Sequence, residues 1–181
     1  RESRARNLPL DCIVQDWKTW PNDLWGQKTF DPERFPDPSG MMAELHQLHT
    51  RLMISIWPIM NPGGDNWREM WAAGCLLGNQ ATYDAFQEQG RALYWQQAND
   101  GLFAHGIDAW WCDCTEPFQA DWMGALKPEP EERLRINTEE AKTYLDPEFI
   151  SAYSLLHSQG IYEGQRRTGS EKRVVNLTRS G

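Results

Sequence analysis

The sequence predicts an α/β fold of parallel strands that alternate with helices, which we interpret as part of a (β/α)8 TIM barrel. Four short apolar stretches, typical of strands covered on both faces, occur at residues 8–17, 52–58, 107–116 and 173–180. Helical patterns fill the intervals between them, and this order implies parallel strands joined by right-handed crossovers. No G-x-G-x-x-G or Walker sequence follows a strand, which counts against an open nucleotide-binding sheet. We therefore expect a partial barrel with about four parallel strands.

Each predicted helix has its own start or stop signal. Asp-Pro pairs at residues 37–38 and 146–147 combine a favourable N-cap with a first-turn proline, and apolar residues at helical spacing follow both pairs. A third helical pattern covers residues 82–105, with its apolar side chains on one stripe. Gly106 is expected to end this helix just before the third strand.

The predicted connections are unequal in length. Links from strand to helix are long, notably residues 18–36 and 117–145, whereas the link from helix to strand at Gly106 is short. The second long link is rich in Pro and Glu, so we expect it to be an exposed loop. Active sites of β/α barrels are built on the loops that follow strands, so function is expected on these long links.

The chain length fits a segment of a barrel better than a complete one. Its 181 residues, 40% of them hydrophobic, can form a real core but fall short of the roughly 250 residues of a full barrel. The chain also begins without Met, in a polar stretch that contains Arg1, Arg4 and Arg6. We therefore expect residues 1–181 to be a single barrel segment, truncated at both ends.

Composition argues against several classes of partner. There are 18 basic and 26 acidic residues, a net charge of −8, and beyond the first few residues no basic cluster that would bind a nucleic-acid backbone. No apolar run approaches the roughly 20 residues that span a bilayer, so no membrane partner is expected.

The cysteines and histidines lack the spacing of a metal site. Cys12, Cys75, Cys112 and Cys114 form neither a zinc-type pattern nor a disulfide scaffold, and free thiols favour the cytoplasm, although the compartment stays open. Strand alternation would place Cys112 and Cys114 on one side and Asp113 on the other, so packing is expected for both thiols. No metal or organic cofactor is expected.

Polar and aromatic residues gather where the predicted strands end. Because these ends converge on one face of a barrel, the following residues would line one bowl: Asp16, Trp17, Trp57, Asp113, Glu116 and Arg179. Carboxylates with indole rings that stack on sugar faces are typical of glycoside hydrolysis. A plainer interpretation is that the acids are solvated turn residues and the ten tryptophans fill the barrel. The apolar surroundings of Asp113 weigh against it, because an unpaired charge is costly there.

Five segments together resemble glycoside hydrolase family 31. They occur in that family's order across almost the whole chain: LPLDCIVQDW, FPDPSGMMAELH, MISIWP, DAWWCDCTEP and RVVNLTRS. The resemblance implies a retaining α-glycosidase barrel, of which these segments look like the second to fifth βα units. The spellings are most similar to the branch with α-xylosidases and bacterial α-glucosidases.

The resemblance also implies roles for single residues. Asp113, the acid of the family's W-x-D-x-x-E pattern, would be the nucleophile, and Glu116 would organise the site. Asp16 would bind sugar hydroxyls beside Trp17 on the same face. Walls of the pocket and a further hydrogen-bonding partner would come from Trp57, Trp111 and Arg179.

The family's general acid is an aspartate downstream of the T-R-S turn, which ends here at Ser180. We therefore expect the parent protein to release terminal α-linked glucose or xylose from oligosaccharides, and the isolated chain to be inactive. Its expected partners are the sugar substrate and either the remainder of the barrel or further copies that pair with its exposed sheet edges. Two alternatives stay open: a non-catalytic carbohydrate-binding module, and an α-glycosidase of another barrel family.

Overall fold

A computed structural model describes residues 1–117 and 129–180 of the chain. Four strands form one sheet: β1 (Cys12–Gln15), β2 (Arg51–Ile56), β3 (Ala109–Cys112) and β4 (Asn176–Thr178). They are hydrogen-bonded in chain order and every pair is parallel, with Ser55 level with Trp111 and Trp111 level with Leu177. The sheet is not closed. The predicted part of a TIM barrel with four parallel strands is therefore confirmed.

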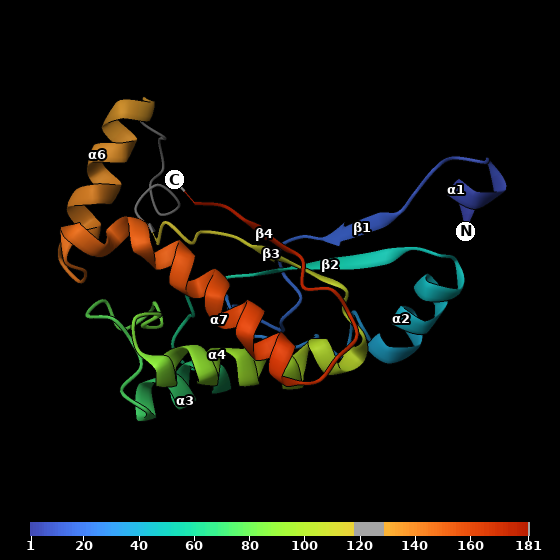
Figure 1. Ribbon diagram of the computed structural model, residues 1–181, viewed down its shortest axis with the longest axis horizontal. Coiled ribbons are helices and arrows are strands. Elements are labelled where there is room, and N and C mark those ends of the chain that lie inside the picture. Colours follow the sequence, from blue (N-terminus) through green and yellow to red (C-terminus); the bar gives the residue numbers. More distant parts are fainter. Residues whose placement is uncertain (118–128, 181) are drawn as a thin grey trace.

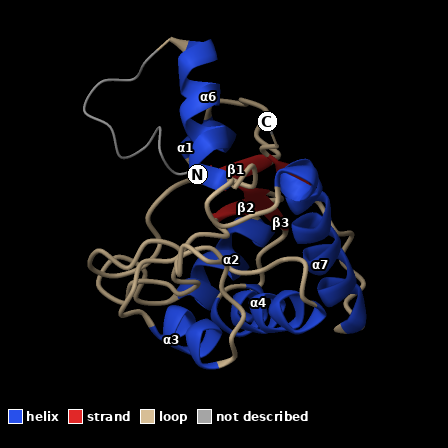
Figure 2. Ribbon diagram, turned by 90° about the vertical axis from the view of Figure 1, so that its left-hand side faces the viewer, coloured by secondary structure: helices blue, strands red, loops and turns tan. Residues whose placement is uncertain are grey.

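Helices occupy the intervals between the strands. In chain order the described ones are α1 (Glu2–Ala5), α2 (Pro38–Gln47), α3 (Asp65–Ala72), α4 (Glu88–Gly101), the 3-10 turn η1 (Phe103–His105), α6 (Pro130–Ala141), the 3-10 helix η2 (Pro147–Ala152) and α7 (Tyr153–Arg167). α4 and α7 lie side by side on one side of the strands, whereas α6 projects away from this layer (Figures 1 and 2). None of the described helices is both long and apolar enough to cross a membrane.

The main core lies between the sheet and this helical layer. It contains Leu52, Ile54 and Ile56 of β2, Trp110 and Cys112 of β3, and apolar side chains of α4 and α7. Trp110 is fully buried, with its ring next to Trp95 and Phe103 and its Nε1 donating to Gln165 Oε1 at 2.9 Å. Burying such a ring stabilises the fold by a few kcal/mol. Because neighbouring strand residues point to opposite faces, Trp111 and Asp113 are left for the other face of the sheet.

Both Asp-Pro starts are confirmed. Asp37 Oδ1 accepts a hydrogen bond from Gly40 N at 2.8 Å at the start of α2, and Asp146 Oδ1 accepts one from Glu148 N at 3.0 Å. The second start opens η2, and the α-helix follows only from Tyr153.

The helix predicted for residues 82–105 begins later than expected, at Glu88. Thr82 and Tyr83 instead make antiparallel bridges with Ile59 and Leu76, and the Asp84 side chain accepts from Phe86 N. These contacts hold residues 82–86 in an irregular turn despite their helical spacing. Tertiary pairing therefore overrides the local pattern.

The link predicted as an exposed loop, residues 117–145, is a loop only in part. Residues 118–128 lie outside the described residues, but α6 covers Pro130–Ala141. Glu131 and Glu132 stand in its first turn, where carboxylates favour a helix N-terminus, and an Arg135–Glu132 ion pair of 2.6 Å supports its exposed face. The Glu-rich composition thus indicated a helix and was wrongly interpreted as a loop.

Candidate active site

Three of the predicted site residues lie directly beyond strand ends and side by side. Trp57 follows β2, Asp113 follows β3, and Arg179 follows β4. The parallel ladder continues past the regular strands, because Asp113 N donates to Ile56 O and Arg179 N donates to Cys112 O, both at 3.0 Å. This shared register brings the three side chains to one place.

Three donors hold the Asp113 carboxylate. Trp57 Nε1 donates to Oδ2 at 3.2 Å, Cys114 N donates to Oδ1 at 2.9 Å, and Arg179 Nη1 lies 3.1 Å from Oδ1. Asp113 is half-buried, so its carboxylate is oriented yet still reachable from solvent. A fixed, negatively charged oxygen at a strand end is what a nucleophile or a partner for positive charge requires.

Arg179 links Asp113 to the second acid of the site. Its Nε donates to Glu116 Oε1 at 2.6 Å, and its Nη2 donates to Glu116 Oε2 at 3.5 Å and to Cys114 Sγ at 3.1 Å. Burial opposes the charge of Arg179, but the hydrogen bond that Arg179 donates to Glu116 and the neighbouring negative groups outweigh burial and raise the pKa of the guanidinium. Arg179 is therefore a permanent cation, and Glu116 is engaged in holding it.

Tryptophan rings surround Trp57. Trp17 and Trp20 both meet it edge to face, with ring centroids 5.4 and 5.1 Å away, and Trp25 lies 5.6 Å from Trp17. Trp57 is only 1% exposed, whereas Trp17 is 51% exposed. Trp17 therefore offers exposed aromatic surface next to Trp57, the buried ring that contacts Asp113.

The remaining two sugar-binding candidates, Asp16 and Trp111, are less closely tied to this centre. Asp16 is exposed and its Oδ1 accepts from Trp17 N at 2.8 Å; across the described ranges no bond joins it to Asp113, Trp57 or Arg179. Trp111 belongs to β3, two residues before Asp113, so both lie on the same face of the sheet. The structure thus brings together Asp113, Glu116, Trp57 and Arg179, with Trp17 as their neighbour.

Both thiols of the C-x-C pair are packed in hydrophobic clusters as predicted, but the prediction that they share one side was wrong. Cys112 packs in the main core as expected, but Cys114 lies with Trp20, Trp57 and Ile59 on the site side. Its φ of +55° is in the left-handed region, which ends the strand alternation on which the prediction rested. All four cysteines are without a disulfide, and within residues 1–117 and 129–180 no group of three or more His, Cys, Asp or Glu could hold a metal ion.

Two contacts that support the site were not predicted from the sequence. Cys114 accepts a bond from Arg179, and Tyr94 of α4 donates its hydroxyl hydrogen to the Trp57 carbonyl oxygen at 2.8 Å. Tyr94 was recognised only as one member of an apolar helical stripe. A hydroxyl group on a stripe expected to face the core was the available hint, since a buried tyrosine needs a hydrogen-bond partner.

A parallel barrel segment with an oriented carboxylate among indole rings defines the class of a carbohydrate-active barrel. The family model for the glycosyl hydrolases family 31 TIM-barrel domain matches residues 1–181. The chain therefore belongs to glycoside hydrolase family 31.

Two curated relatives match almost the whole chain. An alpha-xylosidase of Saccharolobus solfataricus is 37% identical over 180 residues, which cover 99% of this chain and 23% of that protein. An uncharacterized family 31 glucosidase of Pseudescherichia vulneris is 32% identical over 194 residues, with 99% and 34% covered. The chain thus spans between about a quarter and a third of the length of these relatives.

Solved structures give the same result. The GH31 alpha-xylosidase from Xanthomonas citri superposes with a TM-score of 0.80 at 37% identity, covering 99% of this chain and 20% of that one. A GH31 alpha-xylosidase from a soil metagenome, solved with xylose, gives a TM-score of 0.78 at 28% identity, covering 99% and 26%.

Proposed function

We propose that the protein to which this chain belongs is a retaining α-glycosidase that releases terminal α-linked xylose or glucose from oligosaccharides. Asp113 is its nucleophile. The observation that carries this proposal is the carboxylate of Asp113, held at the strand ends by Trp57, Arg179 and the Cys114 amide. The names of the relatives, alpha-xylosidases and a family 31 glucosidase, support the substrate class.

The proposed reaction is a double displacement. An Asp113 oxygen forms a bond to the anomeric carbon while the bond to the leaving oxygen breaks, and a second carboxyl group gives that oxygen its proton. Water then attacks the anomeric carbon, loses a proton to the second group and releases Asp113. The carboxylate also stabilises the positive charge that develops on the sugar ring. Trp17 offers an apolar face on which the pyranose can stack.

The proton donor is proposed to come from another part of the longer protein. In retaining enzymes the two carboxyl groups are about 5–5.5 Å apart. Glu116 is linked to Asp113 through Arg179, but its carboxylate is occupied by two hydrogen bonds from that guanidinium. Residues 1–181 alone should therefore hydrolyse aryl α-xylosides and α-glucosides no faster than buffer does, and turnover with retention would contradict this.

Substitution in the full-length protein tests the nucleophile. Asp113→Asn should lower kcat/KM for an aryl α-xyloside or α-glucoside by at least roughly 10³-fold, because the attacking oxygen is lost. Asp100 is an exposed acid of α4, so Asp100→Asn is the matched control and should keep wild-type rates.

Trapping with a fluorinated α-glycosyl fluoride should add one sugar mass to the peptide that contains residue 113. A label on another peptide would contradict Asp113 as the nucleophile. Sugar binding that survives Asp113→Asn, without any turnover in the wild type, would favour a non-catalytic binding module.

A further inference from the structure

A lysine lies buried behind the tryptophan cluster. Lys28 belongs to the long link of residues 18–36 and is 2% exposed. Its Nζ donates to Gln97 Oε1 at 3.2 Å, touches Met60 Sδ at 3.5 Å, and sits 4.0 Å above the centre of the Tyr94 ring. Met60 follows the β2 end, and Gln97 and Tyr94 belong to α4, so one ammonium group joins three parts of the chain.

The backbone around Lys28 is fixed as firmly as its side chain. Lys28 N donates to Asn66 Oδ1 at 2.7 Å, and Asn66 N donates to Gln27 Oε1 at 3.1 Å. At the end of α4, a Cβ on Gly101 would lie 1.8 Å from the Lys28 carbonyl oxygen, so only glycine allows this approach. The link therefore lies directly against α3 and α4.

Two routes lead from Lys28 to the nucleophile. Through α4, the Tyr94 ring beneath Lys28 Nζ carries the hydroxyl that donates to the Trp57 carbonyl at 2.8 Å. Through the link, the same chain segment carries Trp20, whose ring packs edge to face on Trp57 at 5.1 Å. The first route ends at the Trp57 backbone and the second at the Trp57 indole, which donates to Asp113 at 3.2 Å.

We propose that Lys28 is a positioning residue, which ties the tryptophan-bearing link to Tyr94 and so sets the Trp57 indole against Asp113. The consequence for catalysis rests on the proposed function, but the positioning of the indoles does not.

Burying the Lys28 ammonium group lowers the free energy of unfolding, because the charge loses its contact with water. Burial lowers its pKa to about 7, against the opposing influence of the Glu69 charge. The groups that face it are Glu69 from α3, Tyr94 from α4 and the neutral, buried His157 from α7. A methionine would fill the same space without a charge to desolvate. A residue that only filled the core would gain nothing from the ammonium group.

The test compares Lys28→Met with Lys142→Met, which removes only a surface ion pair of α6. At pH 6.5 we expect Lys28→Met to unfold at the same or a higher temperature than the wild type. At the same time its near-ultraviolet circular dichroism from the indoles should weaken clearly, whereas Lys142→Met should match the wild type. In the full-length protein, KM for an aryl α-glycoside should rise roughly three- to tenfold with a smaller change in kcat.

Two outcomes would overturn the proposal. An unchanged indole signal in Lys28→Met would mean that the ammonium group positions nothing, and a joint loss of stability and signal would mean that it is only a packing element. If Lys28→Met does not fold, Tyr94→Phe removes the hydroxyl that reaches Trp57 and carries the same test. An unchanged signal in that variant would contradict the route through α4. Neither the unfolding temperature nor the circular dichroism signal involves a sugar. These two results therefore stand whether or not Asp113 is the nucleophile.

Discussion

Arg179 is the residue on which the site geometry depends most. One guanidinium contacts Asp113, Glu116 and Cys114 at the same time. Lysine keeps the charge but lacks the planar fork, so Arg179→Lys cannot reproduce the three contacts. Losing one charge-assisted hydrogen bond costs about 1.5–3 kcal/mol, and we expect kcat/KM of the full-length protein to fall roughly 10- to 100-fold in steady-state assays.

Arg135→Lys on α6 is the matched control for this prediction. Arg135 forms an ion pair with Glu132 on an exposed face, and such a pair contributes little. Its replacement should leave kcat/KM within about twofold of the wild type. Equal rates for Arg179→Lys and the wild type would show that the fork geometry is not required.

The residues of the site were predictable where strand geometry alone positions them. Trp57, Asp113 and Arg179 follow successive parallel strands, and parallel strands carry their ends to one face. Cys114 and Lys28 were not predictable in this way. A left-handed backbone at Cys114 has no signal in an apolar stretch, and a lysine in a polar link is normally solvated.

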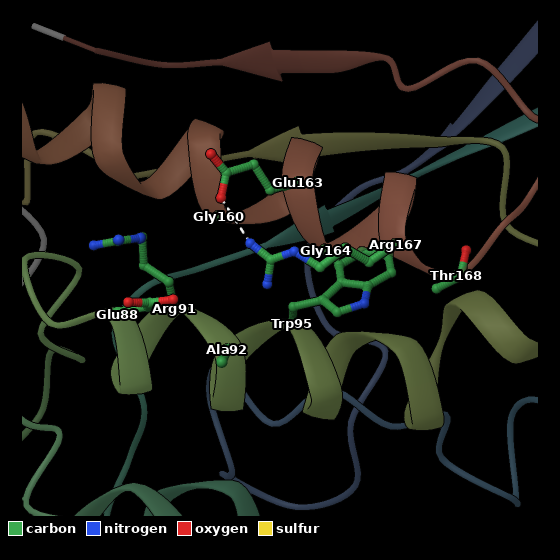
Figure 3. A pocket seen from close by; sticks show the side chains of 9 residues that line it. All are labelled: Glu88, Arg91, Ala92, Trp95, Gly160, Glu163, Gly164, Arg167 and Thr168. Carbon is green, nitrogen blue, oxygen red and sulfur yellow. Dashed lines mark hydrogen bonds and ion pairs between the residues drawn. The ribbon is translucent and has the colours of Figure 1, made fainter.

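The α4–α7 pair is the element that supports the sheet from behind, and its contact depends on small residues. Figure 3 shows Trp95 of α4 against Gly164 of α7, along the groove between the helices. A Cβ on Gly164 would lie 2.2 Å from a carbon of the Trp95 ring, which is itself held by Phe103 and Trp110. Gly164→Ala should therefore lower the free energy of unfolding by about 1–3 kcal/mol in urea titrations.

Gly160→Ala, one turn earlier on α7, is the control. There the three nearest atoms to a Cβ are carbons of the Arg91 side chain, at 3.0–3.2 Å, so the overlap is much smaller than at Gly164 and a shift of a few tenths of an ångström relieves it. Alanine also favours the helix by up to about 1 kcal/mol, so the free energy of unfolding should change by less than about 1 kcal/mol. If both variants lost the same stability, close approach at Trp95 would not explain the effect.

The helices also show where sequence patterns succeed. α2 was predicted from its Asp-Pro start because the cap is a contact between neighbours in the chain. α3 was not predicted, because this helix is only eight residues long and only Asn66 and Met70 in it are buried. The start of α4 was misplaced because Thr82 and Tyr83 pair with residues that are distant in sequence. Local signals were thus reliable only where local contacts determine the structure.

The two edges of the sheet determine how the isolated chain behaves. Val14 of β1 and Leu177 of β4 are 50% and 52% exposed, and unpaired apolar edges favour pairing with another strand. We propose that residues 1–181 alone self-associate through these edges unless the remainder of a barrel covers them. Val14→Lys and Leu177→Lys should each reduce the apparent mass in light scattering, because an edge charge opposes strand pairing. Leu155→Lys, at an exposed position of α7, is the control, and a monomeric wild type would contradict the proposal.

Buried His157 makes the stability of the whole molecule depend on pH. Its Nδ1 is 2.8 Å from the Tyr83 hydroxyl oxygen, and burial, with a smaller influence of the Lys28 charge, lowers its pKa from 6.5 to about 3. Between these values the unfolded chain binds a proton that the folded chain does not, so stability falls as pH drops below 6.5. From pH 6 to 5, where few carboxylates titrate, the free energy of unfolding should fall by about 1 kcal/mol.

His157→Gln should flatten this dependence in urea titrations at several pH values, whereas His49→Asn, at an exposed position, should keep it. An equal slope in His157→Gln would assign the effect to other groups.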